Sequence, residues 1–143
     1  MKPNEVNLSN IAFSELKKLG DHANVVYVNY NKNHFYIKTP ELVIPFDSGT
    51  MFADQKNEKS GKYSIRVSLD NYKTVGHPDH DFYNMLTRLD DIILAEGKKN
   101  AFPWFKKKSI SDELIKEIYN PMVKFSTDKE TGEATDKYPP TFT

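Results

Sequence analysis

The sequence predicts a mainly β protein with helical insertions, and a small barrel or sandwich fits it best. Several short segments are dense in β-branched and aromatic residues and are separated by turn signals. One longer segment in the middle of the chain repeats apolar residues at helical spacing. A chain of 143 residues is long enough for one ordinary domain with a core. We therefore expect a single domain over residues 11–143, preceded by a flexible polar arm over residues 1–10.

The clearest strand signals lie in the first third of the chain. Residues 11–17 permit a strand or one turn of helix. Residues 24–30 (NVVYVNY) and 34–39 (HFYIKT) flank a turn at residues 31–33 and together predict a hairpin. Residues 41–46 (ELVIPF) are expected to continue as extended chain, because Pro40 keeps its predecessor out of a helix and Pro45 favours a strand end or edge.

A long polar loop is expected over residues 47–59, and a strand follows it. Residues 62–69 (KYSIRVSL) alternate apolar and polar side chains, which predicts one face toward the core. The other face is expected to be wet and basic, and it consists of Lys62, Ser64, Arg66 and Ser68.

The middle of the chain predicts an amphipathic helix, with Asp79 or Asp81 as its N-cap and Gly97 just past its last turn. Its apolar stripe consists of Phe82, Met85, Leu86, Leu89, Ile92 and Ile93. Ser109 or Ser111 is then placed to cap a short helix that ends near Ile118. Residues 122–126 and 137–143 are expected to form two strands joined by a turn that contains Gly132.

Composition removes several classes of function. Twenty basic residues balance twenty acidic ones, so no net charge attracts a charged partner from a distance. Without cysteine there is no disulfide, thiolate nucleophile or cysteine-based metal site. No apolar run approaches the roughly 18 to 20 residues that span a bilayer, and the N-terminus lacks a targeting pattern. We expect an intracellular protein that does not cross a membrane.

The candidates for catalysis are few. His77, Asp79, His80 and Asp81 stand close together and include potential metal ligands, but two histidines at this spacing in a loop match no known ligand pattern. Asp79 or Asp81 as a helix cap is the simpler interpretation. The chain also has no phosphate-binding glycine loop, nucleophile elbow or catalytic triad signature. We expect neither an enzyme nor a bound metal or cofactor.

Residues 98–108 (KKNAFPWFKKK) carry the most informative chemistry, because five lysines surround three aromatic rings without any acidic residue. Lysines neutralise phosphates, and exposed rings offer faces on which unpaired bases stack. Single-stranded nucleic acid binding requires both. The alternative is that the rings attach a loop to the core while the lysines keep it soluble. The binding residues expected here are Lys98, Lys99, Trp104, Phe105, Lys106, Lys107 and Lys108.

A second candidate surface is the basic face of the strand over residues 62–69. Lys62 and Arg66 would lie across a sheet from Tyr36 and Lys38, or from Tyr27 and Asn29. A mixed basic and aromatic sheet face of this kind occurs in oligonucleotide-binding barrels. Half-buried packing is the more ordinary role for alternating tyrosines.

Four segments resemble, in order, the single-stranded DNA-binding proteins of the T-odd phage type, whose relatives occur in large nucleocytoplasmic DNA viruses. They are FYIKTPELVIPF (residues 35–46), KYSIRVSLD (62–70), FYNMLTRLDDIIL (82–94) and YNPMVKFSTDKETGEATDKYPPTFT (119–143). The resemblance implies a five-stranded oligonucleotide-binding barrel with an inserted amphipathic helix, in which Lys124 meets phosphate. It also implies a protein that coats unpaired DNA without sequence preference during viral replication, recombination or repair, in the host cell's viral replication compartment.

The family characteristically ends in an acidic tail that recruits replication proteins. This chain stops at Phe142 and Thr143, within an expected strand and without such a tail. We therefore expect either a truncated C-terminus or a resemblance that does not reach the end of the chain.

Two other functions are compatible with the residues. A viral structural or scaffold protein would use the aromatic and basic segment around Trp104 as a protein interface, because tryptophan and basic residues also mark interface hot spots. A metal-dependent hydrolase would use His77 and His80. A homo-oligomer is compatible with each of these.

Overall fold

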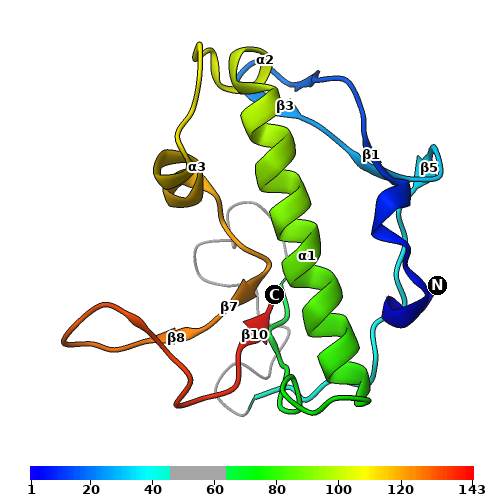
Figure 1. The fold of residues 1–143 in the computed structure, drawn as a ribbon, viewed down its shortest axis with the longest axis vertical. Helices are drawn as coiled ribbons and strands as arrows, with labels where there is room; N and C mark the ends of the chain where they lie inside the picture. Colours follow the sequence, from blue (N-terminus) through cyan, green and yellow to red (C-terminus); the bar gives the residue numbers. More distant parts are fainter. Residues whose placement is uncertain (46–63) are drawn as a thin grey trace. The chain divides into compact units, whose positions relative to one another are not determined.

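The computed structural model describes residues 1–45 and 64–143, which form short antiparallel sheets and three α-helices (Figure 1). The helices are α1 (Pro78–Lys99), α2 (Ala101–Phe105) and α3 (Asp112–Ile118), and two 3₁₀ turns, η1 (Pro3–Glu5) and η2 (Leu8–Asn10), open the chain. The strands are β1 (Ile11–Phe13), β2 (Lys17–Leu19), β3 (Ala23–Val25), β4 (Val28–Tyr30), β5 (Asn33–His34), β6 (Val67–Ser68), β7 (Val123–Lys124), β8 (Ser126–Thr127), β9 (Ala134–Thr135) and β10 (Thr141–Phe142).

The strands pair as four separate sheets, in the orders β1-β4-β5, β6-β10-β7, β2-β3 and β8-β9. The predicted β-rich class with inserted helices is therefore confirmed. In the described part of the chain no sheet closes into a barrel. No helix among these residues is long and apolar enough to cross a membrane.

The chain divides into two compact units. The first unit consists of Met1–Lys38 and Thr87–Pro121, and the second consists of Thr39–Leu86 and Met122–Thr143. Helix α1 contributes its first residues to the second unit and its remaining residues to the first.

In the first unit, β4 and β5 form the predicted hairpin. Its turn residues Asn31 and Lys32 have φ angles of 48° and 64°, the left-handed pair that a two-residue hairpin turn requires. The hairpin is shorter than predicted, because residues 23–25 pair with β2 instead. The first ten residues lie against this sheet, where the Asn7 N–H donates to the Tyr30 hydroxyl at 3.1 Å and the Asn31 N–H donates to the Asn10 carbonyl.

The core of the first unit lies where α1, α2 and α3 meet. Ala101, Ile110 and Ile115 are buried there, with Leu94, Phe105 and Leu114 packed against them. Helix α3 begins as predicted, because the Ser111 hydroxyl oxygen accepts a hydrogen bond from the Leu114 N–H.

In the second unit, β10 is the central strand of a three-stranded sheet. Phe142 on β10 packs edge-on against the buried Phe82 of α1, with ring centroids 5.5 Å apart. The fully buried Leu69, which follows β6, donates its N–H to the Pro140 carbonyl. Residues 122–126 and 137–143 thus contain the paired strands β7 and β10, and Gly132 lies in the turn between β8 and β9.

Several local predictions are wrong. Helix α1 begins at Pro78, so Asp79 and Asp81 lie within its first turn and neither is its N-cap. Ser68, expected on the wet face of its strand, is buried. Its polar groups are satisfied there, because its hydroxyl donates to the Asp70 carboxylate and its N–H donates to the Val43 carbonyl. Gly97, expected beyond the last helical turn, lies inside α1 and is buried. A Cβ at this position would come within 2.8 Å of Ile115 Cδ1, so only glycine leaves room for α3 to pack this closely on α1.

Candidate nucleic-acid interface

Helix α2 places the aromatic and basic segment on the first unit. The helix ends at Phe105, and its C-cap residue Lys106 has a left-handed φ of 57°. The backbone N–H groups of Lys106 and Lys107 cap the helix carbonyls. The Lys106 N–H donates to the Phe102 carbonyl at 2.9 Å, and the Lys107 N–H donates to the Ala101 carbonyl. This reversal brings the Lys106 ammonium over the Phe102 ring, 5.7 Å from its centroid.

The three rings of this segment differ in exposure. Phe102 is 67% exposed, whereas Trp104 and Phe105 are half-buried. The Trp104 ring packs edge-on against Phe13 of β1 with centroids 6.2 Å apart, and against Phe105 with centroids 6.4 Å apart. Phe102 is therefore the ring with the most accessible face, and it is absent from the binding residues selected by sequence. The i, i+4 spacing of Phe102 and Lys106 was a usable signal.

The five lysines fall into two groups. Lys98 pairs with Asp112 at 2.6 Å, and its ammonium holds the pKa of the Asp112 carboxyl below the ordinary value. Lys99 lies 3.9 Å from Glu96. Lys106, Lys107 and Lys108 are exposed and, within the described part of the chain, form no ion pair. The cations best placed to meet phosphates therefore follow α2.

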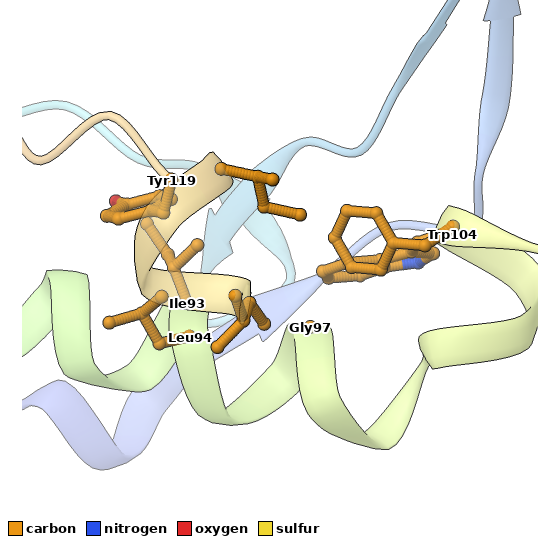
Figure 2. A pocket seen from close by; sticks show the side chains of 8 residues that line it. Ile93, Leu94, Gly97, Trp104 and Tyr119 are labelled. Carbon is orange, nitrogen blue, oxygen red and sulfur yellow. The ribbon is translucent and has the colours of Figure 1, made fainter. Parts of the chain in front are cut away.

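An apolar cavity of about 250 Å³ opens beside Trp104 (Figure 2). Its walls come from the C-terminal half of α1, from α2, and from α3 and the residue that follows it: Ile93, Leu94, Gly97, Trp104, Phe105, Ile115, Ile118 and Tyr119. The Tyr119 hydroxyl donates to the buried Asp90 carboxylate at 2.5 Å. Burial and this hydrogen bond raise the pKa of Tyr119 well above its ordinary value.

The second predicted surface is not assembled as expected. Strand β6 pairs with β10 and, through an isolated bridge, with Val43, so its neighbours include neither the segment of Tyr36 nor that of Tyr27. Residues 35–42 form no strand, partly because Pro40 has no N–H to donate.

Several residues of that surface, and Lys124, are exposed one by one. Tyr36 is 75% exposed and packs edge-on against His34, and the Lys38 N–H donates to the Met1 carbonyl at 2.9 Å. Arg66 is exposed just before β6, and Lys124 is exposed on β7, opposite Thr141. Lys62 lies outside the described residues.

The histidine and aspartate cluster forms hydrogen bonds that hold the loop before α1 in the second unit. The Asp79 carboxylate is buried in the first turn of α1 and accepts a hydrogen bond from the Asn71 N–H at 3.0 Å, so it anchors the preceding loop. The Tyr72 carbonyl accepts a hydrogen bond from His80 Nδ1. Among residues 1–45 and 64–143, no three histidine or acidic side chains are grouped to hold a metal ion.

Comparison with known proteins adds no relative. No protein-family model matches the chain, and neither a curated protein nor a solved structure matches it.

Proposed function

We propose that this protein binds single-stranded DNA without sequence preference and coats it during viral replication, recombination or repair. The observation that carries the proposal is the exposed Phe102 ring beneath the Lys106 ammonium, in a segment with five lysines and no acid. A ring face stacks on an unpaired base, and a neighbouring ammonium neutralises the adjoining phosphate. The oligonucleotide-binding barrel predicted from the sequence belongs to this proposal.

The residues take separate roles in the proposed complex. Phe102 stacks on a base, and Lys106, Lys107 and Lys108 bind phosphates. Lys98 and Lys99 bind further phosphates once the strand displaces their acidic partners. Trp104 and Phe105 contribute the part of their rings that the core leaves accessible. Lys62, Arg66, Tyr36, Lys38 and Lys124 are proposed as further contacts along the strand.

The proposed function is that of a binding protein rather than an enzyme. It acts inside the cell, in a viral replication compartment, and replication proteins are its proposed partners.

The test is the affinity for fluorescent oligo-dT as a function of salt. Substituting Phe102→Ala removes one stacking ring, so we expect an affinity loss of about 5- to 150-fold, corresponding to roughly 1 to 3 kcal/mol per stacked base. The matched control is Tyr138→Ala, because Tyr138 is also exposed and carries a lysine, Lys137, 5.5 Å from its ring centroid in the second unit. Equal affinity of the wild type and Phe102→Ala would contradict the stacking role.

A second arm of the test removes the cations. Replacing Lys106, Lys107 and Lys108 with alanine should reduce the slope of log affinity against log salt by about 2, since each contact with single-stranded DNA contributes roughly 0.7. Duplex DNA and RNA of equal length define the preferred polymer.

A protein interface is the second candidate, favoured by the apolar cavity beside Trp104 and by the exposed Phe102 ring on the same helix. Such an interface would show as association that depends on protein concentration and responds weakly to salt. Gel filtration at several concentrations separates it from phosphate binding.

A further inference from the structure

The cavity beside Trp104 has the size and lining of a site for one small ring. An engineered apolar cavity of about 150 Å³ holds a benzene ring, so about 250 Å³ is sufficient for a single pyrimidine. The aromatic walls are Trp104, Phe105 and Tyr119, and the remaining walls are aliphatic except at Gly97. Figure 2 shows these side chains converging from α1, α2 and the α3 region around one space.

The charges next to the cavity indicate what the ring is attached to. Lys98 and Lys99 directly follow the lining residue Gly97, and Lys106 directly follows the lining residue Phe105. Lys106 forms no ion pair among the described residues, whereas Lys98 is paired with Asp112 and Lys99 lies near Glu96. An apolar ring that carries an anionic group fits the cavity and Lys106, and a second anionic group would displace the acidic partners of Lys98 and Lys99. A nucleotide within a single strand has this composition, because each base is flanked by phosphates.

The lining also discriminates between bases. The Tyr119 hydroxyl is already used by Asp90, so the cavity offers little to a hydrogen-bonding edge. A polar edge buried without a partner is costly, whereas a buried methyl group is favourable. The base that fits is thymine, with its C5 methyl group inward and its polar edge toward solvent.

We infer that this cavity receives one thymine base of the bound single strand, and this inference rests on the proposed function. Trp104 then forms a wall of a base pocket, while the more exposed stacking ring is Phe102. This pocket refines the sequence-independent binding proposed above: the lysines bind any single strand, and the pocket adds a preference for thymine at one position.

The test compares oligo-dT with oligo-dU, which differ only in the C5 methyl group. The wild type is expected to bind oligo-dT about fourfold more tightly, the effect of burying one methyl group. Gly97→Ala projects a methyl group into the cavity, where its Cβ would lie 2.8 Å from Ile115 Cδ1, 3.6 Å from Phe105 and 3.8 Å from Trp104. In this variant we expect the two oligomers to bind with equal affinity, because the added methyl group takes the space of the thymine methyl group.

Two further variants protect the test against misfolding. Ile118→Phe adds bulk at the rim, where Ile118 is 52% exposed, and should also reduce the ratio of the two affinities toward one. Ala95→Leu adds bulk at an exposed position of α1 outside the cavity and should leave the ratio at its wild-type value.

The outcomes separate the base pocket from the proposed function. Failure of both oligomers to bind the wild type would overturn the proposed function and this inference together. If the wild type binds oligo-dT and oligo-dU equally, and the lysine substitutions still weaken both, only the base pocket is overturned. The cavity would then be a site for an apolar protein side chain. An unchanged preference for oligo-dT in both filling variants would also overturn it.

Discussion

At the scale of single residues, the hydrogen bond from Tyr119 to Asp90 shows how a buried carboxylate is accommodated beside an apolar cavity. Asp90 lies on α1 and is buried, and a buried carboxylate is costly unless donors surround it. The Tyr119 hydroxyl supplies one such donor from the end of α3. The contact therefore links α3 to α1 through a polar bond next to their apolar packing.

Substituting Tyr119→Phe removes this donor and should lower the free energy of unfolding by about 1 to 3 kcal/mol, measured by urea denaturation at pH 7. The substitution should also change the response to alkaline pH. The pKa of Tyr119 is raised in the folded chain above its ordinary value of 10.0, so above that pH the unfolded chain loses the proton first. Wild-type stability therefore falls as pH rises above 10, and a fall of the same size in Tyr119→Phe would contradict this assignment.

The ion pair of Lys98 and Asp112 gives a prediction of increased binding. Asp112→Asn releases the Lys98 ammonium, so we expect tighter binding of oligo-dT and a salt slope larger in magnitude by up to about 0.7. Asp136→Asn is the matched control, because it makes the same charge change and releases Lys73 from a 3.0 Å pair in the second unit. Equal gains in the two variants would show that net charge alone is responsible.

The residue scale also shows where prediction from sequence ends. The chemistry of residues 98–108 is evident from composition, but the exposure of each ring is not. Trp104 is half-buried because Phe13, far away in the sequence, packs against it. No local pattern identifies such a partner. For the same reason, the sequence reveals neither the cavity nor the fact that Gly97 lines it.

At the scale of elements, predictions succeeded where the signal is local and strong. The apolar stripe of α1, the cap at Ser111 and the turn at residues 31–33 each depend on neighbours in sequence, and each is confirmed. The alternation over residues 62–69 failed at Ser68, and Ile65, expected to point toward the core, is 40% exposed. A strand's inward face is set by its partners, here β10 and Val43, which sequence periodicity does not reveal.

At the scale of the whole molecule, helix α1 is the element common to both units. It supplies Phe82 to the core of the second unit and Leu94 to that of the first. Because one continuous helix serves both cores, we expect the two units to unfold in one cooperative transition.

Phe142→Ala tests this cooperativity. The substitution removes a half-buried ring that packs on Phe82, so we expect a loss of about 2 to 3 kcal/mol, below the range of roughly 3 to 5 for fully buried phenylalanines. Trp104, the only tryptophan, reports the first unit, and far-ultraviolet circular dichroism reports the whole chain. Both midpoints should fall together, with Tyr138→Ala as the exposed control, and a Trp104 midpoint that stays at its wild-type value would contradict a single transition.

The left-handed turn between β4 and β5 offers a route to a sturdier protein for crystallisation or spectroscopy. Its second residue, Lys32, is a lysine with φ of 64°, a conformation that costs a side-chain-bearing residue roughly 1 kcal/mol and costs glycine almost nothing. Introducing glycine there gives the asparagine–glycine pair that suits this turn best. Lys32→Gly should therefore raise the melting temperature by a few degrees while leaving the proposed contacts of residues 98–108 untouched.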